Sequence, residues 1–290
     1  MSYRLQIGIL IAFPVLLVGA LYAIGASIPV PVLGRDYVAR VALPAGSATI
    51  GMPDIAGPSD PSRPLILIDA GHGGYDLGSV SEGYLEKSIV LQLALALRER
   101  LVEEGGIRVA MTRDDDSFIV LEERAEIART MGADLLLSIH ADSAGEREDV
   151  AGASIYTLSE TASSQAAARF AERENDADII NGTNLSEQDV AVNAILVELS
   201  QRRTSERSAD FAALIEREGQ GTLQFHPQSR RSAALAVLRA PDVPAVLFES
   251  GFVTNPDEAE RLASPEGRQR FADVLARSIR IYFARQSIER

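Results

Sequence analysis

The chain has 290 residues, 41 acidic against 28 basic side chains, a formal net charge of −13 and no cysteine. No basic stripe offsets the acidic charge, which argues against nucleic-acid binding. Without cysteine the chain has no disulfide, thiolate zinc site or catalytic thiol.

The first 30 residues differ in kind from the rest of the chain. After Arg4 an uncharged apolar run of about 20 residues follows, typical of a signal peptide and long enough to span a bilayer. We expect residues 1–30 to direct export, as a cleaved signal peptide or as a retained inner-membrane anchor. Residues 31–63 are rich in proline, glycine, alanine and serine, which predicts a flexible tether.

From residue 64 onward the chain alternates strand and helix patterns. The apolar run 65–69 predicts a strand covered on both faces, and apolar residues every four positions over 89–101 predict a helix that ends near Gly105 and Gly106. Further strands are predicted at 107–111, 134–139, 152–158 and 244–249, and further helices at 121–131, after Asn255, and from Pro265 to about 283. This alternation predicts one α/β domain, 64–285, with a largely parallel sheet and helices on both faces.

A polar, helical segment over about 161–225 interrupts the alternation. Ser186, three residues before Asp189, resembles a capping box at a helix start, and Gly219 is a suitable helix end.

Two of the three histidines follow apolar strands: His72 comes after 65–69 and His140 after 134–139. The carboxyl ends of strands in an open α/β sheet are where ligands collect, and imidazole is a common zinc ligand. Glu86, at the start of the next helix, is the candidate third ligand, although a helix start also favours a carboxylate through the helix dipole alone. Two histidines, a carboxylate and a free position for water predict a zinc hydrolase.

Glu249 ends the apolar run 245–249, so a strand delivers a carboxylate to the same edge of the sheet. Charged residues are rarely buried without a partner, and we predict that Glu249 is a general base acting on water. Asp142 either orients an imidazole from behind or is a solvated loop carboxylate.

Five blocks occur in an order that resembles a known family: LILIDAGHGGYDLGS, YLEKSIVLQLALAL, TRDDDSFIVLEERAEIA, ADLLLSIHAD and VLRAPDVPAVLFESGFVTNPDEAERL. They are similar to the zinc-dependent N-acetylmuramoyl-L-alanine amidases of the amidase_3 type over residues 64–284. The resemblance implies a three-layer α/β domain with a mixed, mostly parallel sheet of about six strands. It implies Zn²⁺ ligands His72, Glu86 and His140, and Glu249 as the catalytic carboxylate. The implied reaction cleaves, with zinc-activated water, the amide between N-acetylmuramic acid and L-alanine of the stem peptide of peptidoglycan, in the periplasm.

The segment 161–225 resembles the insertion of Gram-negative division amidases, in which a helix covers the zinc cleft until a LytM-domain-type activator displaces it. Glu174 is then the candidate autoinhibitory zinc ligand; the alternative is a solvated surface helix. His226 is either a substrate contact or a surface histidine, and Arg230 and Arg231 are candidates to meet the acidic stem peptide.

Two other functions remain open at this point. One is a different zinc hydrolase of stem peptides, resembling a carboxypeptidase. The other is a non-catalytic wall-binding module, which the presence of all four site residues disfavours.

Overall fold

The computed structural model describes residues 51–81, 83–176 and 194–289, together with Phe13, Leu16 and two short strands near residue 180. The chain divides into two units, 1–50 and 51–290, and all elements discussed below belong to the second. The predicted signal or anchor segment lies outside the described residues except for Phe13 and Leu16, which are helical. In the described part of the chain, no helix is both long and apolar enough to cross a bilayer.

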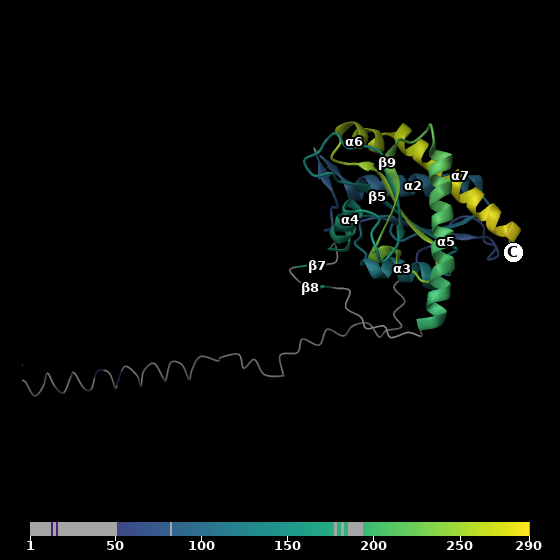
Figure 1. Ribbon diagram of the computed structural model, residues 1–290, viewed down its shortest axis with the longest axis horizontal. Helices are drawn as coiled ribbons and strands as arrows, with labels where there is room; N and C mark the ends of the chain where they lie inside the picture. Colours follow the sequence, from purple (N-terminus) through teal and green to yellow (C-terminus); the bar gives the residue numbers. More distant parts are fainter. Residues whose placement is uncertain are drawn as a thin grey trace, which may run out of the picture. The chain divides into compact units, whose positions relative to one another are not determined.

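A mixed sheet forms the centre of the second unit, and among the described residues it has six strands in the order β4-β1-β5-β10-β6-β9 (Figure 1). These strands are β1 (Leu65–Ala70), β4 (Arg108–Met111), β5 (Leu135–Asp142), β6 (Ala153–Leu158), β9 (Phe225–Ala233) and β10 (Ala245–Phe252). The first four in the order run parallel; β6 is antiparallel to β10, and β9 is parallel to β6. Two-stranded hairpins are formed by β2 (Val80–Ser81) with β3 (Tyr84–Leu85), and by β7 (Ile179–Ile180) with β8 (Thr183–Asn184).

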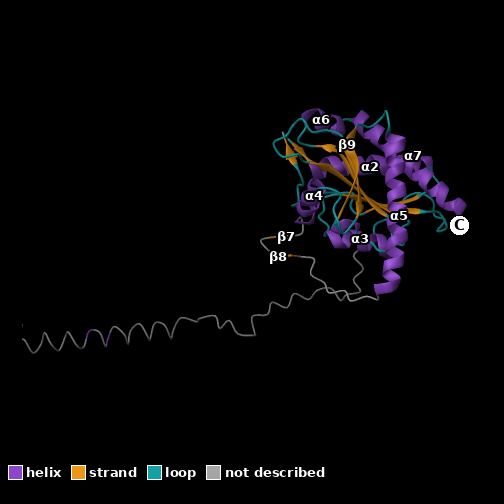
Figure 2. Ribbon diagram, viewed as in Figure 1, coloured by secondary structure: helices purple, strands orange, loops and turns teal. Residues whose placement is uncertain are grey.

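Helices cover both faces of the sheet, which confirms the predicted three-layer α/β fold (Figure 2). One face packs against α2 (Glu86–Glu104), α5 (Ala194–Gly219), α6 (Pro256–Ala263) and α7 (Pro265–Glu289). The other packs against α3 (Leu121–Thr130), α4 (Gln165–Asn175) and the 3₁₀ helix η2 (Ala236–Leu238). Along each strand the side chains alternate between the two cores: Ile66 and Ile68 face the α2 side, and Leu65 and Leu67 face the α3 and α4 side.

The local signals for helix ends match the structure. Helix α2 ends at Gly105, whose φ of +71° suits glycine, and α5 ends at Gly219 as predicted. The side chain of Asn255 caps α6 by accepting from the backbone N–H of Glu258, with Pro256 in the first turn. The predicted capping box at Ser186 lies outside the described residues.

Two strands extend beyond their predicted ends. Strand β5 continues through Asp142 and β10 through Phe252, since these two residues still pair across the sheet. His140 therefore lies within a strand and not after it, which corrects the sequence prediction, and Glu249, predicted to be the last residue of its strand, lies in the interior of β10. Strand β9 was not predicted, because an edge strand with several exposed polar residues lacks the apolar pattern of a central strand.

Candidate metal centre and catalytic carboxylate

His72 occupies the turn after β1 with a φ of +59°, and no other non-glycine residue among those described has a positive φ. This conformation costs about 1–3 kcal/mol and persists only where the surroundings enforce it. The guanidinium of Arg124 on α3 donates to the carbonyls of Ala70 and His72, each at 2.9 Å. Arg113 donates to the carbonyl of Gly71 at 2.6 Å. The two buried arginines thus hold the backbone that presents His72.

Gly71 brings the two histidines together. A Cβ at this position would lie 2.4 Å from the Nε2 and Cε1 atoms of His140, so any larger residue would displace that ring. The ring centroids of His72 and His140 are 4.8 Å apart. Gly71 therefore allows the ring of His140, from the neighbouring strand β5, to pack closely against the backbone before His72.

Asp76 orients the imidazole of His72. Its Oδ2 atom lies 2.8 Å from Nδ1 of His72, and its Oδ1 atom accepts from the backbone N–H of Gly78 at 3.1 Å. With Nδ1 engaged, Nε2 faces the cleft, 2.9 Å from Oε1 of Glu86. The sequence prediction missed Asp76; the signal was its position four residues after His72, since metal-binding histidines commonly donate their second N–H to a carboxylate.

Glu86 is the first residue of α2 and is 2 % exposed. Backbone N–H groups from two other segments hold its carboxylate: Ser79 donates to Oε2 at 2.7 Å and Ala141 donates to Oε1 at 3.0 Å. A carboxylate that only neutralised the helix dipole would be solvated at the surface. Glu86 is instead buried and aimed at the histidines.

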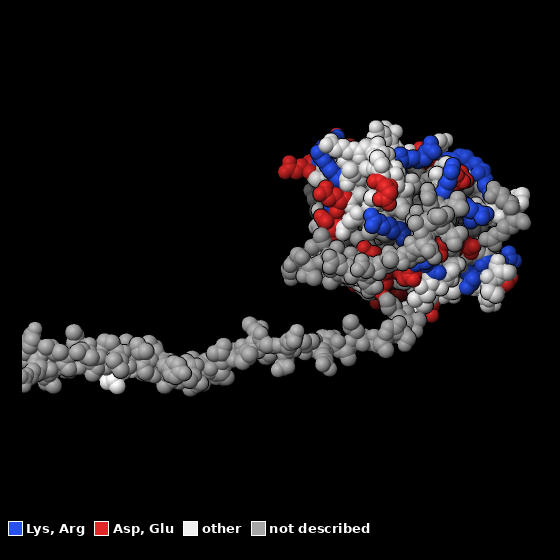
Figure 3. All heavy atoms as spheres, turned by 60° about the horizontal axis from the view of Figure 1, so that its bottom comes forward, with Lys and Arg blue, Asp and Glu red and all other residues white. Residues whose placement is uncertain are grey.

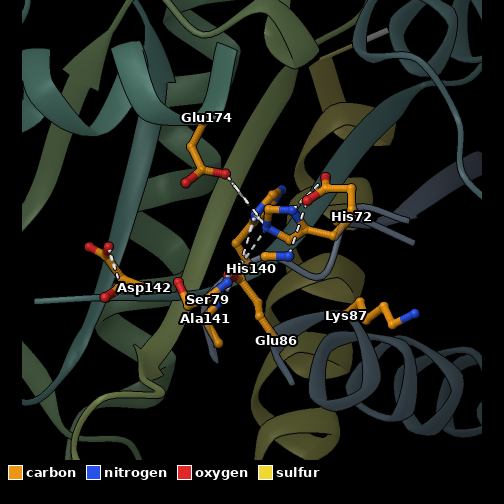
Figure 4. A network of polar contacts seen from close by, with 12 residues as sticks. His72, Ser79, Glu86, Lys87, His140, Ala141, Asp142 and Glu174 are labelled. Atoms are coloured by element: carbon orange, nitrogen blue, oxygen red, sulfur yellow. Dashed lines mark hydrogen bonds and ion pairs between the residues drawn. The ribbon is translucent and has the colours of Figure 1, made fainter. Parts of the chain in front are cut away.

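The predicted ligand set converges at His140. Its Nδ1 atom lies 3.1 Å from Nε2 of His72 and 3.2 Å from Oε1 of Glu86. Ligand atoms of His72, His140 and Glu174 lie within 4.8 Å of one another, a group that could hold a metal ion. Figure 4 shows the carboxylate of Glu174 directed at the ring of His140, whereas the ammonium of Lys87 points away. Two imidazoles with carboxylates are the ligand chemistry of catalytic zinc sites, so these residues fit zinc.

The carboxylates of this cluster favour a positive charge at its centre. Burial works to lower the pKa of His72, but Glu86 and Asp76 raise it to about 10. Burial also works to lower the pKa of His140, but Glu174 and Glu86 raise it to about 10. Burial works to raise the pKa of Glu86, but the two imidazoles hold it well below its usual range. A divalent cation supplies the same kind of compensation.

Glu249 is 1 % exposed, and neither of its carboxylate oxygens has a hydrogen-bond partner among the described residues. It pairs in register with His140 across β10 and β5, so both side chains leave the same face of the sheet. Burial, followed by the charges of Asp142 and Glu86, raises the pKa of Glu249 well above its usual range. A buried carboxyl with a raised pKa beside a cluster of metal-type ligands is suited to accepting a proton during a reaction.

Helix α4 brings Glu174 into the same cleft. Ser164 caps the helix by accepting from the backbone N–H of Ala167 at 3.1 Å. Glu174 is 7 % exposed, and its Oε2 atom lies 3.3 Å from Nδ1 of His140 and 3.6 Å from Nε2 of His72. The alternative of a solvated surface position for Glu174 is therefore wrong.

Asp142 contacts neither imidazole and is not solvated, so both sequence interpretations of it were wrong. It is 6 % exposed, and its Oδ1 atom accepts from Arg173 of α4 at 2.7 Å. Arg173 also donates to Oε1 of Glu174 at 3.2 Å and to the carbonyl of Ser143 at 3.3 Å. No local pattern predicts this ion pair, because Asp142 and Arg173 come from a strand and a helix and lie 31 positions apart in the chain.

The third histidine lies on β9, at the edge of the sheet. Nδ1 of His226 accepts from Arg231 at 2.8 Å and from the backbone N–H of Gln228 at 3.0 Å. Arg231 also donates to the hydroxyl of Tyr156 at 3.0 Å, while Arg230 forms an ion pair with Glu216. A substrate contact by these residues stays a prediction.

The whole second unit resembles known proteins. A family model described as N-acetylmuramoyl-L-alanine amidase (Amidase_3) matches residues 66–280. The N-acetylmuramoyl-L-alanine amidase AmiA of Salmonella typhimurium is 37 % identical over 224 residues, which cover 77 % of each chain. AmiC of Neisseria meningitidis is 35 % identical over 230 residues, or 79 % of this chain and 55 % of AmiC. The structure of AmiC2 of Nostoc punctiforme matches with a TM-score of 0.54 and 27 % identity, covering 76 % of this chain and 97 % of that one.

Proposed function

This chain belongs to the N-acetylmuramoyl-L-alanine amidase family, and from that premise we propose a zinc mechanism, a regulatory helix and a location in the cell envelope. The substrate is peptidoglycan, and the bond cleaved joins the lactyl group of N-acetylmuramic acid to L-alanine of the stem peptide. One observation carries the site assignment. Nε2 of His72, Nδ1 of His140 and Oε1 of Glu86 meet within 3.2 Å, beside the carboxylate of Glu249, which has no hydrogen-bond partner in the described part of the chain.

In this proposal His72, Glu86 and His140 hold Zn²⁺, and Asp76 keeps Nε2 of His72 turned toward it. Zinc would make a water molecule acidic near pH 7 and polarise the scissile carbonyl. Glu249 takes the proton from the attacking water and passes it to the leaving nitrogen of L-alanine.

We further propose that α4 inhibits the enzyme in the form described here. The carboxylate of Glu174 faces both imidazoles, where it competes with water and substrate for the metal. Arg173 fastens the same turn of α4 to Asp142 through a charged hydrogen bond of 2.7 Å. Activity then requires α4 to move, and the partner that moves it would be an activator of the LytM-domain type.

Peptidoglycan lies outside the inner membrane, so the proposed substrate requires export. The uncharged apolar run within residues 1–30 supports export to the periplasm, by a cleaved signal peptide or a membrane anchor.

Digestion of purified sacculi tests the proposed reaction. We expect the chain carrying Glu174→Ala to release stem peptides that begin with L-alanine and to leave free lactyl groups on the glycan, as seen by mass spectrometry. Chelation of zinc and Glu249→Gln should each abolish release. Products shortened at the carboxyl end of the stem peptide would identify a carboxypeptidase-like hydrolase, and binding to sacculi without any product would identify a wall-binding module.

A further inference from the structure

A second buried polar group lies beside Glu249 and has no role in the proposed mechanism. Ser154 on β6 is 1 % exposed, and its Oγ atom has no hydrogen-bond partner among the described residues. A buried hydroxyl without a partner is destabilising, and such groups concentrate where a ligand supplies the missing bond.

Ser154 shares a face of the sheet with the catalytic groups. Glu249 pairs in register with His140 on one side and with Ser154 on the other. The residues next to Ser154 and Glu249, Ile155 and Phe248, pack into the opposite core against α2, α5 and α7. His140, Glu249 and Ser154 therefore form one row across β5, β10 and β6, on the face that α4 covers.

Helix α4 packs on this face of the sheet at two places. At one end Glu174 meets His140. At the other, the ring of Phe170 stacks on Tyr156, two residues along β6 from Ser154, with ring centroids 4.3 Å apart. The displacement of α4 proposed above would open this face at His140 and at Tyr156, the two residues between which Ser154 and Glu249 lie.

We propose that Ser154 contacts the substrate and accepts the N–H of the scissile amide, an inference that rests on the proposed function. His140 marks the metal side of Glu249, and Ser154 lies on the other side. Water attacks the carbonyl carbon on the metal side, the C–N bond breaks, and the water proton travels through Glu249 to the nitrogen. The nitrogen therefore lies on the side of Glu249 away from the metal, beside Ser154.

The chemistry of the amide favours this contact. A secondary amide brings one N–H donor into a cleft from which water is expelled, and a donor left unpaired there weakens binding. A serine hydroxyl has two acceptor lone pairs, and the lone pairs of Ser154 are unused among the described residues. The carboxylate of Glu249 is engaged with the attacking water, which leaves Ser154 to accept the amide N–H.

Ser250 provides a matched control. Like Ser154 it is a buried serine, 4 % exposed, whose Oγ atom has no hydrogen-bond partner among the described residues. It adjoins Glu249 on β10 but lies outside the row, because Glu249 itself holds the register position between His140 and Ser154.

The test compares an amide with an ester in the full chain carrying Glu174→Ala. The amide is a soluble N-acetylmuramoyl-L-alanyl peptide, and the ester is the same molecule with L-lactate in place of L-alanine, so that oxygen replaces the N–H. We expect Ser154→Ala to lower kcat/KM on the amide by about tenfold, the loss of one hydrogen bond, and to leave kcat/KM on the ester within about twofold. Ser250→Ala should alter neither value.

Equal losses on both substrates, no loss on the amide, or an equal effect of Ser250→Ala would overturn the role of Ser154 while leaving the amidase intact. A parent chain that hydrolyses no amide would refute the proposed function and this inference together. Should Ser154→Ala fail to fold, as judged by its melting temperature, Ser154→Cys keeps the side-chain shape with a weak acceptor and must show the same selective loss on the amide.

Discussion

Glu249 has no hydrogen-bond partner among the described residues, and the charge of Arg173 offsets only part of the cost of its burial. Its carboxyl is buried without a hydrogen bond, near the charges of Asp142 and Glu86. Such a group lowers the stability of the fold, and retention of groups of this kind is common at active sites. The cost is understandable if the side chain carries a proton during the reaction.

The substitution Glu249→Gln separates the cost of Glu249 to stability from its role in proton transfer. We expect activity to fall by about 10²–10⁴-fold, the usual contribution of a general base, while the melting temperature stays level or rises because no charge is buried. Muropeptide release and thermal unfolding measure the two. Activity within about tenfold of the parent would show that another group moves the proton.

Asp76 is predicted to act through His72. Asp76→Asn removes the carboxylate from Nδ1 of His72, and loss of such a partner typically weakens metal affinity about 10–100-fold. Competition with a chelator of known affinity measures the metal affinity of each variant. Asp116→Asn is the control, since Asp116 holds Lys87 and the backbone of Gly74 in the same region without contacting an imidazole. Equal affinities in the two variants would contradict a positioning role.

Asp69 links the stability of the fold to pH. It is fully buried and accepts from Arg124 at 2.8 Å, Thr112 at 2.7 Å and Ser138 at 2.6 Å. Burial works to raise the pKa of Asp69, but Arg124 and the two hydroxyls hold it below 3.8. A lowered folded-state pKa gives stability that is present above pH 3.8 and is lost as pH falls through the folded-state value.

Asp69→Asn should therefore cost about 3–5 kcal/mol near neutral pH, where it leaves Arg124 buried without its charge partner. Below the folded-state pKa of Asp69, the difference from the parent chain should shrink. Urea unfolding at neutral and acidic pH measures both values. A difference that is the same at the two pH values would exclude this linkage.

At the scale of elements, the proposed inhibition makes activity depend on the position of α4. We expect Glu174→Ala to raise the rate of sacculus digestion by about tenfold or more, because a single charged ligand is worth about 1.5–3 kcal/mol. Glu172→Ala is the matched control: Glu172 belongs to the same helix but is exposed and should leave the rate unchanged. Equal rates in the parent and in Glu174→Ala would remove the case for self-inhibition.

What the sequence predicted at this scale depends on local pattern. The buried strand 65–69, the helix from Glu86 and the cap at Asn255 each follow from a few neighbouring residues, and the structure confirms them. The extension of β5 past His140 and the whole of β9 depend on pairing with distant strands. Local periodicity does not contain that information.

At the site, too, local pattern predicted some residues, and contacts with distant residues were needed to identify others. The residue types and strand positions of His72, His140 and Glu249 were sufficient to predict that they meet. Asp76 and Ser154 were missed, because their importance appears only once hydrogen-bond partners and strand register are known. Asp142 was misjudged for a related reason: its partner, Arg173, comes from an insertion whose position no local signal indicates.

At the scale of the molecule, the acidic side chains on the face shown in Figure 3 do not form one continuous patch. Figure 3 shows acidic and basic side chains interspersed on the face turned to the viewer. The concentration of like charge lies inside, where the carboxylates of Glu86, Glu174 and Glu249 surround two histidines. A cation stabilises a buried cluster of carboxylates of this kind, and the proposed chemistry of the cleft depends on which residues hold that cation.

Anomalous diffraction at the zinc absorption edge, from crystals of the full chain grown with zinc, tests that point most directly. We predict one strong peak enclosed by Nε2 of His72, Nδ1 of His140 and Oε1 of Glu86, with the carboxylate of Glu174 on its remaining side. A zinc-replete crystal with no peak there, or with zinc bound by other residues, would contradict the proposed centre.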